Sequence, residues 1–318
     1  MIELKAIPAQ FGNAYVLFGF EAIQARPNLD PYTSTLRTND ETMQVFTSDV
    51  HLKHHVRRGL KAHAFAKEIG KPEAAVFYEK EDEAGNPRDF AGRLKLLRET
   101  CGIDAKAADK KDALNYCLDL PLFGYVHAVK SENFNVTNAA NTLFRPSTFH
   151  SCEIFSLGRN NAFSTEKEGV LQDSSGSATV DSLEYGFFLA LWEINLNMLR
   201  VNAEGHKVVD WKEAGAKGWL ELLVNGMWRA YTTDRFPSFT QRSQFAQFVV
   251  GWTPAGEVSY ENPAELIDKL EHRKLTAHHE AVAALNGALP VFLKGWGCEP
   301  SSRFVSHAAS NCKLDCLG

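Results

Sequence analysis

Residues 45–61 of the chain read VFTSDVHLKHHVRRGLK and predict an amphipathic helix with one basic face. The side-chain oxygen of Ser48 or Asp49 can accept hydrogen bonds from the free backbone N–H groups of the first turn, so either residue can cap the helix. The helix is expected to end near residue 69, because Gly70 and Pro72 follow. Apolar residues recur every fourth position and form one stripe that faces a core: Leu52, Val56 and Leu60.

A basic stripe lies beside the apolar one. Lys53, Arg57 and Lys61 have the same spacing, and His54 and Arg58 are next to them. Such a face offers positive donors to phosphates about one helical turn apart, which supplies affinity rather than sequence specificity. By the helix pattern alone, a solvated helix face is the commoner reason for a charge run of this kind. At this level both interpretations remain open.

Length and composition describe an ordinary globular protein. The 318 residues are 44% hydrophobic and 23% charged, which allows one large domain with insertions or two domains with ample core. The net charge is -5, whereas a free nucleic-acid-binding domain is usually basic. Nucleic-acid binding would therefore need local positive patches. Because no apolar run is long enough for a membrane span and no signal peptide is recognised, we expect a cytoplasmic chain with no membrane partner.

Six cysteines are sparse for this length and fit a reduced cytosolic protein. Four residues that could bind zinc gather near the C-terminus: Cys298, His307, Cys312 and Cys316. Their spacing contains no Cys-x-x-Cys pair, which favours unrelated thiols over a zinc site. We therefore expect no metal ion and no cofactor.

Helical and strand patterns alternate irregularly along the chain, which predicts an α+β fold. The polar, glycine- and serine-rich stretch 158–182 has no helical apolar period and predicts a protruding loop or hairpin. Strands are expected at 15–23, 74–78, 122–129, 149–155, 185–196, 245–252 and 290–296. Further helices are expected at 88–100, 107–117, 210–228 and 263–285.

The order of these features resembles the CRISPR-associated backbone subunit of type I Cascade surveillance complexes, in the RAMP superfamily, with subtype I-B as a candidate. The specific part is the segment near 45–60, where a capped helix carries the family's Leu-Lys-x-x-x-Arg pattern as Leu52-Lys53-His54-His55-Val56-Arg57. The preceding loop, Asn28-Leu29-Asp30-Pro31, departs from the family by having Leu29 where glycine is common. Three further stretches match by order: Leu122 to Val126, Gly186 to Leu196, and Thr240-Gln241-Arg242-Ser243.

The resemblance implies a modified ferredoxin-like palm, similar to an RNA-recognition motif. The palm would comprise residues 1–69, 121–156 and 183–318, with helical fingers at 70–120 and a thumb hairpin at 157–182. Copies of such a subunit stack along the guide RNA (crRNA) as a helical filament, and each thumb kinks the RNA. The implied partners are the crRNA, target DNA paired to it, copies of the same chain and other Cascade subunits. Base pairing would then read the sequence, while the protein, which we expect not to be an enzyme, would hold backbone and shape.

The resemblance also implies roles for particular residues. Lys53, Arg57 and Arg58 would bind guide phosphates, and charge reversal at the first two is expected to remove RNA without unfolding the chain. The other expected RNA contacts come from the helix and from loops: Ser48, His51, His54, Arg37, Arg145, Gln241 and Arg242. In the thumb, Phe163 and Leu171 could wedge against a displaced base, although packing within the hairpin explains them equally well.

Three other functions fit parts of the sequence. Related type III backbone subunits cut target RNA through an aspartate after the first strand, where Asp30 and Asp40 lie, but the Asn-x-Asp-Pro context favours a structural carboxylate. A free RNA-processing protein could use the histidines at 51, 54, 55 and 63, which we expect to point to different sides of the helix. The third alternative is an oligomeric scaffold without nucleic acid.

Overall fold

The computed structural model describes most of the first 254 residues and one later strand. The described residues are 11–25, 30, 32–33, 35–41, 44–67, 75–78, 89–103, 115–129, 132–142, 154–159, 165–167, 170–172, 178–232, 246–254 and 305–308. Most of the helix expected at 107–117, the helix expected at 263–285 and the strand expected at 290–296 lie outside them.

One antiparallel sheet organises the molecule. Its strands lie in the order β10 (Val305–Ala308), β9 (Ala246–Pro254), β1 (Phe11–Ala25), β8 (Ala178–Asn195) and β4 (Ala140–Thr142). A further strand, β5 (Ile154–Arg159), pairs with the first residues of β8. The mixed helix-and-sheet class is confirmed, and so are the strands expected within β1, β8 and β9. The short strands β4 and β10 are not predicted by the sequence patterns.

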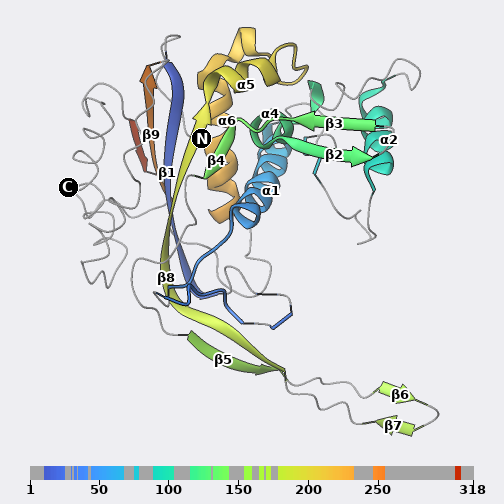
Figure 1. Cartoon of the computed structure of the whole chain (residues 1–318), viewed down its shortest axis with the longest axis vertical. Helices are drawn as coiled ribbons and strands as arrows, with labels where there is room; N and C mark the ends of the chain where they lie inside the picture. Colours follow the sequence, from blue (N-terminus) through green and yellow to red (C-terminus); the bar gives the residue numbers. More distant parts are fainter. Residues whose placement is uncertain are drawn as a thin grey trace.

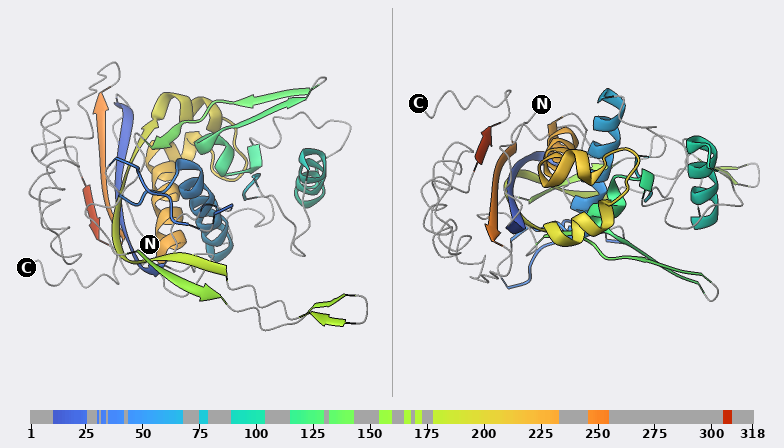
Figure 2. Two further views of the ribbon diagram at one scale, coloured as in Figure 1. Left: turned by 60° about the horizontal axis from the view of Figure 1, so that its bottom comes forward. Right: turned by 90° about the horizontal axis from the view of Figure 1, so that it is seen from above.

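One face of the sheet builds the main core. Alternate residues of β8 point to that face and are buried, as are Ala14 and Val16 of β1, which lie opposite Ile194 and Trp192. Three helices pack on this side: α1 (Asp49–Lys67), α5 (Leu196–Ala203) and α6 (Trp211–Thr232) (Figures 1 and 2). The stripe predicted for α1 is confirmed, since Leu52, Val56 and Leu60 are all buried in this core.

Helices α1 and α6 cross at two glycines. A Cβ atom added to Gly59 would lie 1.9 Å from the carbonyl oxygen of Gly226, and one added to Gly226 would lie 2.7 Å from Cδ2 of Leu60. The first clash is with backbone and the second is with the end of a flexible side chain. The two helices therefore pack at a distance that only glycine allows at position 59.

Gly59→Ala is expected to destabilise the protein by about 3 kcal/mol, because the clash with the α6 backbone forces the helices apart. Gly226→Ala should cost less, since the Leu60 side chain can move. Urea unfolding of both variants measures the difference. If Gly59→Ala were as stable as the wild type, helped by the higher helix propensity of alanine, the close crossing of α1 and α6 would be incorrect.

A second, smaller core lies beside the sheet. It joins the segment 75–78, α2 (Phe90–Cys101), α4 (Asp119–Phe123), β2 (Tyr125–Val129) and β3 (Glu132–Val136). Strands β2 and β3 form an antiparallel hairpin (Figure 1). Its buried members are Phe77, Leu94, Leu97, Cys117, Leu120 and Val136. Helix α2 confirms the helical pattern at 88–100.

The strand expected at 122–129 is partly wrong, because its first residues belong to the short helix α4 and the strand begins at Tyr125. Gly124 separates the two with a φ of 64° and lies against β3, where a Cβ atom would be 2.4 Å from the carbonyl oxygen of Val136. The apolar run at 118–123 is buried on all sides, so its periodicity cannot distinguish helix from strand.

A paired arm extends from the sheet. Residues Ala178 to Leu183 of β8 pair with β5, and the same long strand then continues into the sheet beside β1. Beyond this ladder, β6 (Thr165–Lys167) and β7 (Val170–Gln172) form a small hairpin, which Figure 1 and the left view of Figure 2 show away from the helices. The protruding hairpin expected at 158–182 agrees with these strands. Among the described segments, no helix is both long and apolar enough to cross a membrane.

Candidate nucleic-acid interface

Helix α1 begins at the cap that the sequence predicts. The hydroxyl oxygen of Ser48 accepts a hydrogen bond from the backbone N–H of His51 at 3.2 Å, and its carbonyl accepts from Leu52 N–H at 3.0 Å. In the loop before the helix, Thr38 and Val45 form an isolated antiparallel β-bridge. Ser48 therefore uses its side chain to start the helix.

Lys53 belongs to a polar network between α1 and β4. Its ammonium lies 2.9 Å from Oδ2 of Asp49 and 3.3 Å from Oδ1 of Asn141, and only 10% of the side chain is exposed. The other carboxylate oxygen of Asp49 accepts the hydroxyl proton of Thr142 at 2.9 Å. Asn138 also donates to Oδ1 of Asn141. These contacts fasten the first turns of α1 to the end of the sheet.

Arg57 forms a buried ion pair. Its Nε lies 3.1 Å from Oδ2 of Asp119, whose side chain is fully buried, and the arginine side chain itself is 11% exposed. The guanidinium also lies over two aromatic rings, 4.9 Å from the centroid of Tyr78 and 5.1 Å from that of Phe123. Arg57 thus joins α1 to the start of α4.

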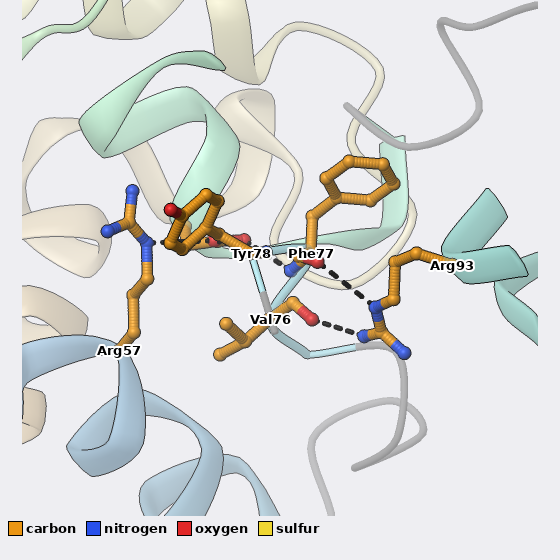
Figure 3. Close-up of polar contacts among 6 residues, drawn as sticks. Arg57, Val76, Phe77, Tyr78 and Arg93 are labelled. Atoms are coloured by element: carbon orange, nitrogen blue, oxygen red, sulfur yellow. Dashed lines mark hydrogen bonds and ion pairs between the residues drawn. The ribbon is translucent and has the colours of Figure 1, made fainter. Parts of the chain in front are cut away.

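Two charged side chains hold the segment 75–78, which belongs to no sheet among the described strands (Figure 3). Asp119 accepts the backbone N–H groups of Phe77 and Tyr78 at 2.7 and 3.1 Å. From α2, the guanidinium of Arg93 donates to the carbonyl oxygen of Phe77 at 3.1 Å and to that of Val76. These side chains satisfy backbone groups that a neighbouring strand would otherwise pair. The strand expected at 74–78 is therefore wrong for the described residues 75–78, which form an irregular segment with bends at Ala75 and Phe77.

The open basic face that the sequence predicts is wrong for Lys53 and Arg57, because both are buried in ion pairs. Among the described residues of α1, His54 and Arg58 are exposed and Lys61 is partly exposed. Arg58 follows His54 by four residues, and Lys61 follows Arg58 by three. Charge reversal at Arg57 would place a second carboxylate beside buried Asp119, so we now expect it to destabilise the fold as well as to affect any RNA contact. The RNA-contact roles of all these residues remain predictions.

Two of the four helix histidines converge. The Nε2 atoms of His51 and His55 lie 3.0 Å apart, and their rings meet edge to face. The expectation that the histidines all point to different sides is therefore wrong for this pair. His63 instead faces α6, where it accepts a hydrogen bond from Arg229 at 3.3 Å. Burial, and then the nearby charges of His54 and Arg37, lower the pKa of His51 to about 4. Burial also lowers the pKa of His55 well below its usual value.

Another buried histidine, His206, holds the chain between α5 and α6. Its Nδ1 accepts backbone N–H groups from Val208 and Val209 at 3.2 and 3.0 Å, which leaves Nε2 to donate to the carbonyl oxygen of Cys117. These contacts require the neutral ring, and burial lowers the pKa of His206 to about 4.

Stability is expected to fall as the pH drops from 6.5 towards 4. In this window the unfolded chain binds protons at His51 and His206 that the folded chain excludes, because their pKa values fall from 6.5 to about 4 on folding. Each histidine then contributes a slope of up to about 1.4 kcal/mol per pH unit. Urea unfolding at several pH values measures the slope, and His51→Gln should reduce it. A slope identical to that of the wild type would contradict the contribution of His51.

Asp30 serves the loop after β1 as a turn-forming carboxylate. Its Oδ1 accepts the backbone N–H groups of Tyr32 and Thr33 at 2.9 and 3.2 Å, and its Oδ2 lies 3.8 Å from the guanidinium of Arg37. The two backbone hydrogen bonds, despite opposing desolvation, lower the pKa of Asp30. Arg37, expected to contact RNA, is therefore directed at least partly towards its own loop.

The family model of the CRISPR-associated protein Cas7 matches residues 12–281. The chain belongs to the Cas7 family. No curated protein matches it. A solved chain described as "CRISPR RNA-guided surveillance complex, pre-nicking" is similar over 89% of each chain, with 13% sequence identity and a TM-score of 0.51. A second, described as "CRISPR RNA-guided surveillance complex", covers 94% of this chain and 90% of its own, with 12% identity and a TM-score of 0.48.

Other predicted site residues of this Cas7 family member lie outside the described parts of the chain: Arg145, Phe163, Gln241 and Arg242. Leu171 lies in β7, opposite Glu166. Of the four potential zinc ligands, only His307 falls in a described element, β10. Within the described residues no group of three or more histidine, cysteine or acidic residues could hold a metal ion.

The sequence patterns miss three residues of this site. Asp119, Asn141 and Tyr78 contact Lys53 or Arg57 from other elements of this Cas7 family member. One signal is visible for Asp119, which stands alone as a charge in the apolar run Leu118 to Phe123. A lone acid in such a run requires a buried partner. No comparable signal marks Asn141 or Tyr78.

Proposed function

We propose that this chain is a non-catalytic, crRNA-binding backbone subunit of a CRISPR surveillance complex. The family match over residues 12–281 is the observation that carries the proposal. The similarity of fold to a chain of an RNA-guided surveillance complex supports it. The chain would work in the cytoplasm with copies of itself and with other Cascade subunits.

The strand order supports a ferredoxin-like palm. The strands β9-β1-β8-β4 are antiparallel neighbours, α1 lies between β1 and β4 in sequence, and α6 lies between β8 and β9. This is a βαββαβ arrangement in which the first and third strands are central. We assign the fingers to α2 and the second core, and the thumb to the arm of β5, β8, β6 and β7.

Guide binding would use the exposed side of α1. Arg58 is exposed there and Lys61 is partly exposed, with exposed His54 beside them, and these residues are spaced about one helical turn apart, which suits successive phosphates. The buried pairs of Lys53 and Arg57 would hold α1 in place beneath this surface. Contacts to phosphate position the guide, and the bases remain open to pair with target DNA.

The geometry of Asp30 supports a subunit without ribonuclease activity. Both carboxylate oxygens already serve the loop, one through two backbone N–H groups and one towards Arg37. A carboxylate that orients a metal ion or a 2′-hydroxyl needs an oxygen directed at the substrate. Incubation of the assembled complex with RNA complementary to the guide should give no periodic cleavage that depends on Asp30.

Purification of the chain from a host that carries the matching CRISPR array tests the proposal directly. We expect the protein to purify as extended multimers with a high ratio of 260 to 280 nm absorbance. Sequencing of the bound RNA should return spacer sequence. If the same purification at low salt gave a monomer free of nucleic acid, the proposed function would be rejected.

A further inference from the structure

The polar network between α1 and β4 contains a fixed amide. Asn141 accepts two hydrogen bonds at Oδ1, from the ammonium of Lys53 at 3.3 Å and from the amide of Asn138. Lysine ammonium can only donate, so the oxygen of Asn141 must face it and the orientation of the amide is not interchangeable. The Nδ2 group of Asn141 consequently points away from the network.

That Nδ2 group is available to a ligand. Asn141 is exposed, and within the part of the chain described by the structure its Nδ2 makes no hydrogen bond. Its side chain is nevertheless immobilised, because Lys53 and Asn138 both hold its oxygen. A donor that is fixed before binding loses little conformational entropy when it meets an acceptor.

The charges around Asn141 indicate the chemistry of that acceptor. Asp49 neutralises Lys53 at 2.9 Å, so the network presents a neutral donor and little net positive charge. A phosphate gains little at a charge-balanced position, whereas a neutral hydroxyl is well matched to an amide donor. The ribose 2′-hydroxyl both donates and accepts, and it is the group that distinguishes RNA from DNA.

We propose that Asn141 is a specificity-determining residue of the guide-binding surface, whose Nδ2 group donates to a ribose 2′-hydroxyl next to the α1 phosphate contacts. This role rests on the proposed function, since it assumes that RNA lies along α1. It assigns discrimination between RNA and DNA to β4 and affinity to the exposed basic residues of α1.

Binding of a short single-stranded RNA and of the DNA of the same sequence, measured by fluorescence anisotropy on the full chain after removal of copurified nucleic acid, tests the assignment. Asn141→Ala should lower the RNA-to-DNA affinity ratio about fivefold, the usual effect of one hydrogen bond. Asn141→Asp keeps the acceptor for Lys53 and Asn138, removes the donor and adds a negative charge. The charge weakens RNA and DNA binding alike and cancels in the ratio, so the loss of the donor should lower the ratio as in Asn141→Ala.

Asn135→Ala is the matched control, because Asn135 is an exposed asparagine on β3 outside the network. It should leave the ratio unchanged. An unchanged ratio in both Asn141 variants, with tight RNA binding by the wild type, would overturn the role of Asn141 and leave the proposed function standing. A wild-type chain that binds neither strand would overturn both.

Discussion

Replacement of Asp119 by alanine should destabilise the protein by about 3–5 kcal/mol, the usual cost of removing one partner of a buried ion pair. The carboxylate is fully buried and accepts Arg57 Nε at 3.1 Å together with the backbone N–H groups of Phe77 and Tyr78. Its removal leaves a nearly buried guanidinium and two N–H groups without their acceptor. Urea unfolding followed by circular dichroism measures the loss.

A double-mutant cycle separates the ion pair from the backbone contacts. Arg57→Met keeps a long apolar side chain near the rings of Tyr78 and Phe123 and removes the charge, so the double variant should be less destabilised than the sum of the single variants. Glu99→Ala is a suitable control, because Glu99 belongs to an exposed pair with Lys95 at 3.8 Å. Strict additivity at positions 57 and 119 would show that the pair is not coupled.

Charge reversal at both Arg58 and Lys61 should weaken the binding of single-stranded RNA about a hundredfold, if each substitution removes about 1.4 kcal/mol. The physical reason is the loss of two phosphate contacts on the exposed side of α1, with repulsion in their place. The salt dependence gives a more specific signature. The slope of log affinity against log salt should fall by about 1.4, because each lost contact on a single strand removes about 0.7.

The double variant Lys212→Glu and Lys217→Glu is the matched control. It reverses the same number of charges on α6, where both lysines are exposed. Its RNA affinity should change little beyond the general effect of net charge, and its salt slope should match the wild type. Equal losses in the two double variants would mean that RNA binding follows net charge and has no site on α1.

Much of the architecture follows from local patterns. The cap at Ser48 and the stripe of Leu52, Val56 and Leu60 predict α1 correctly, since both depend on residues within a few helical turns. The same holds for the long apolar strands β1 and β8. The apolar run of α4 is less informative, because a segment buried on all sides lacks the periodicity that separates helix from strand.

Local patterns in the sequence are enough to predict the principal helices and strands and the order of features that resembles the Cas7 family. Which basic residues of α1 reach the surface depends instead on packing against distant elements. Arg57 meets Asp119, 62 residues away, and Lys53 meets Asn141, 88 residues away. Helical periodicity specifies which residues share a face, but it carries no information about the element that packs on that face. The proposed guide contacts therefore lie at Arg58, which is exposed, and at Lys61, which is partly exposed, whereas distant partners bury Lys53 and Arg57, and both form ion pairs.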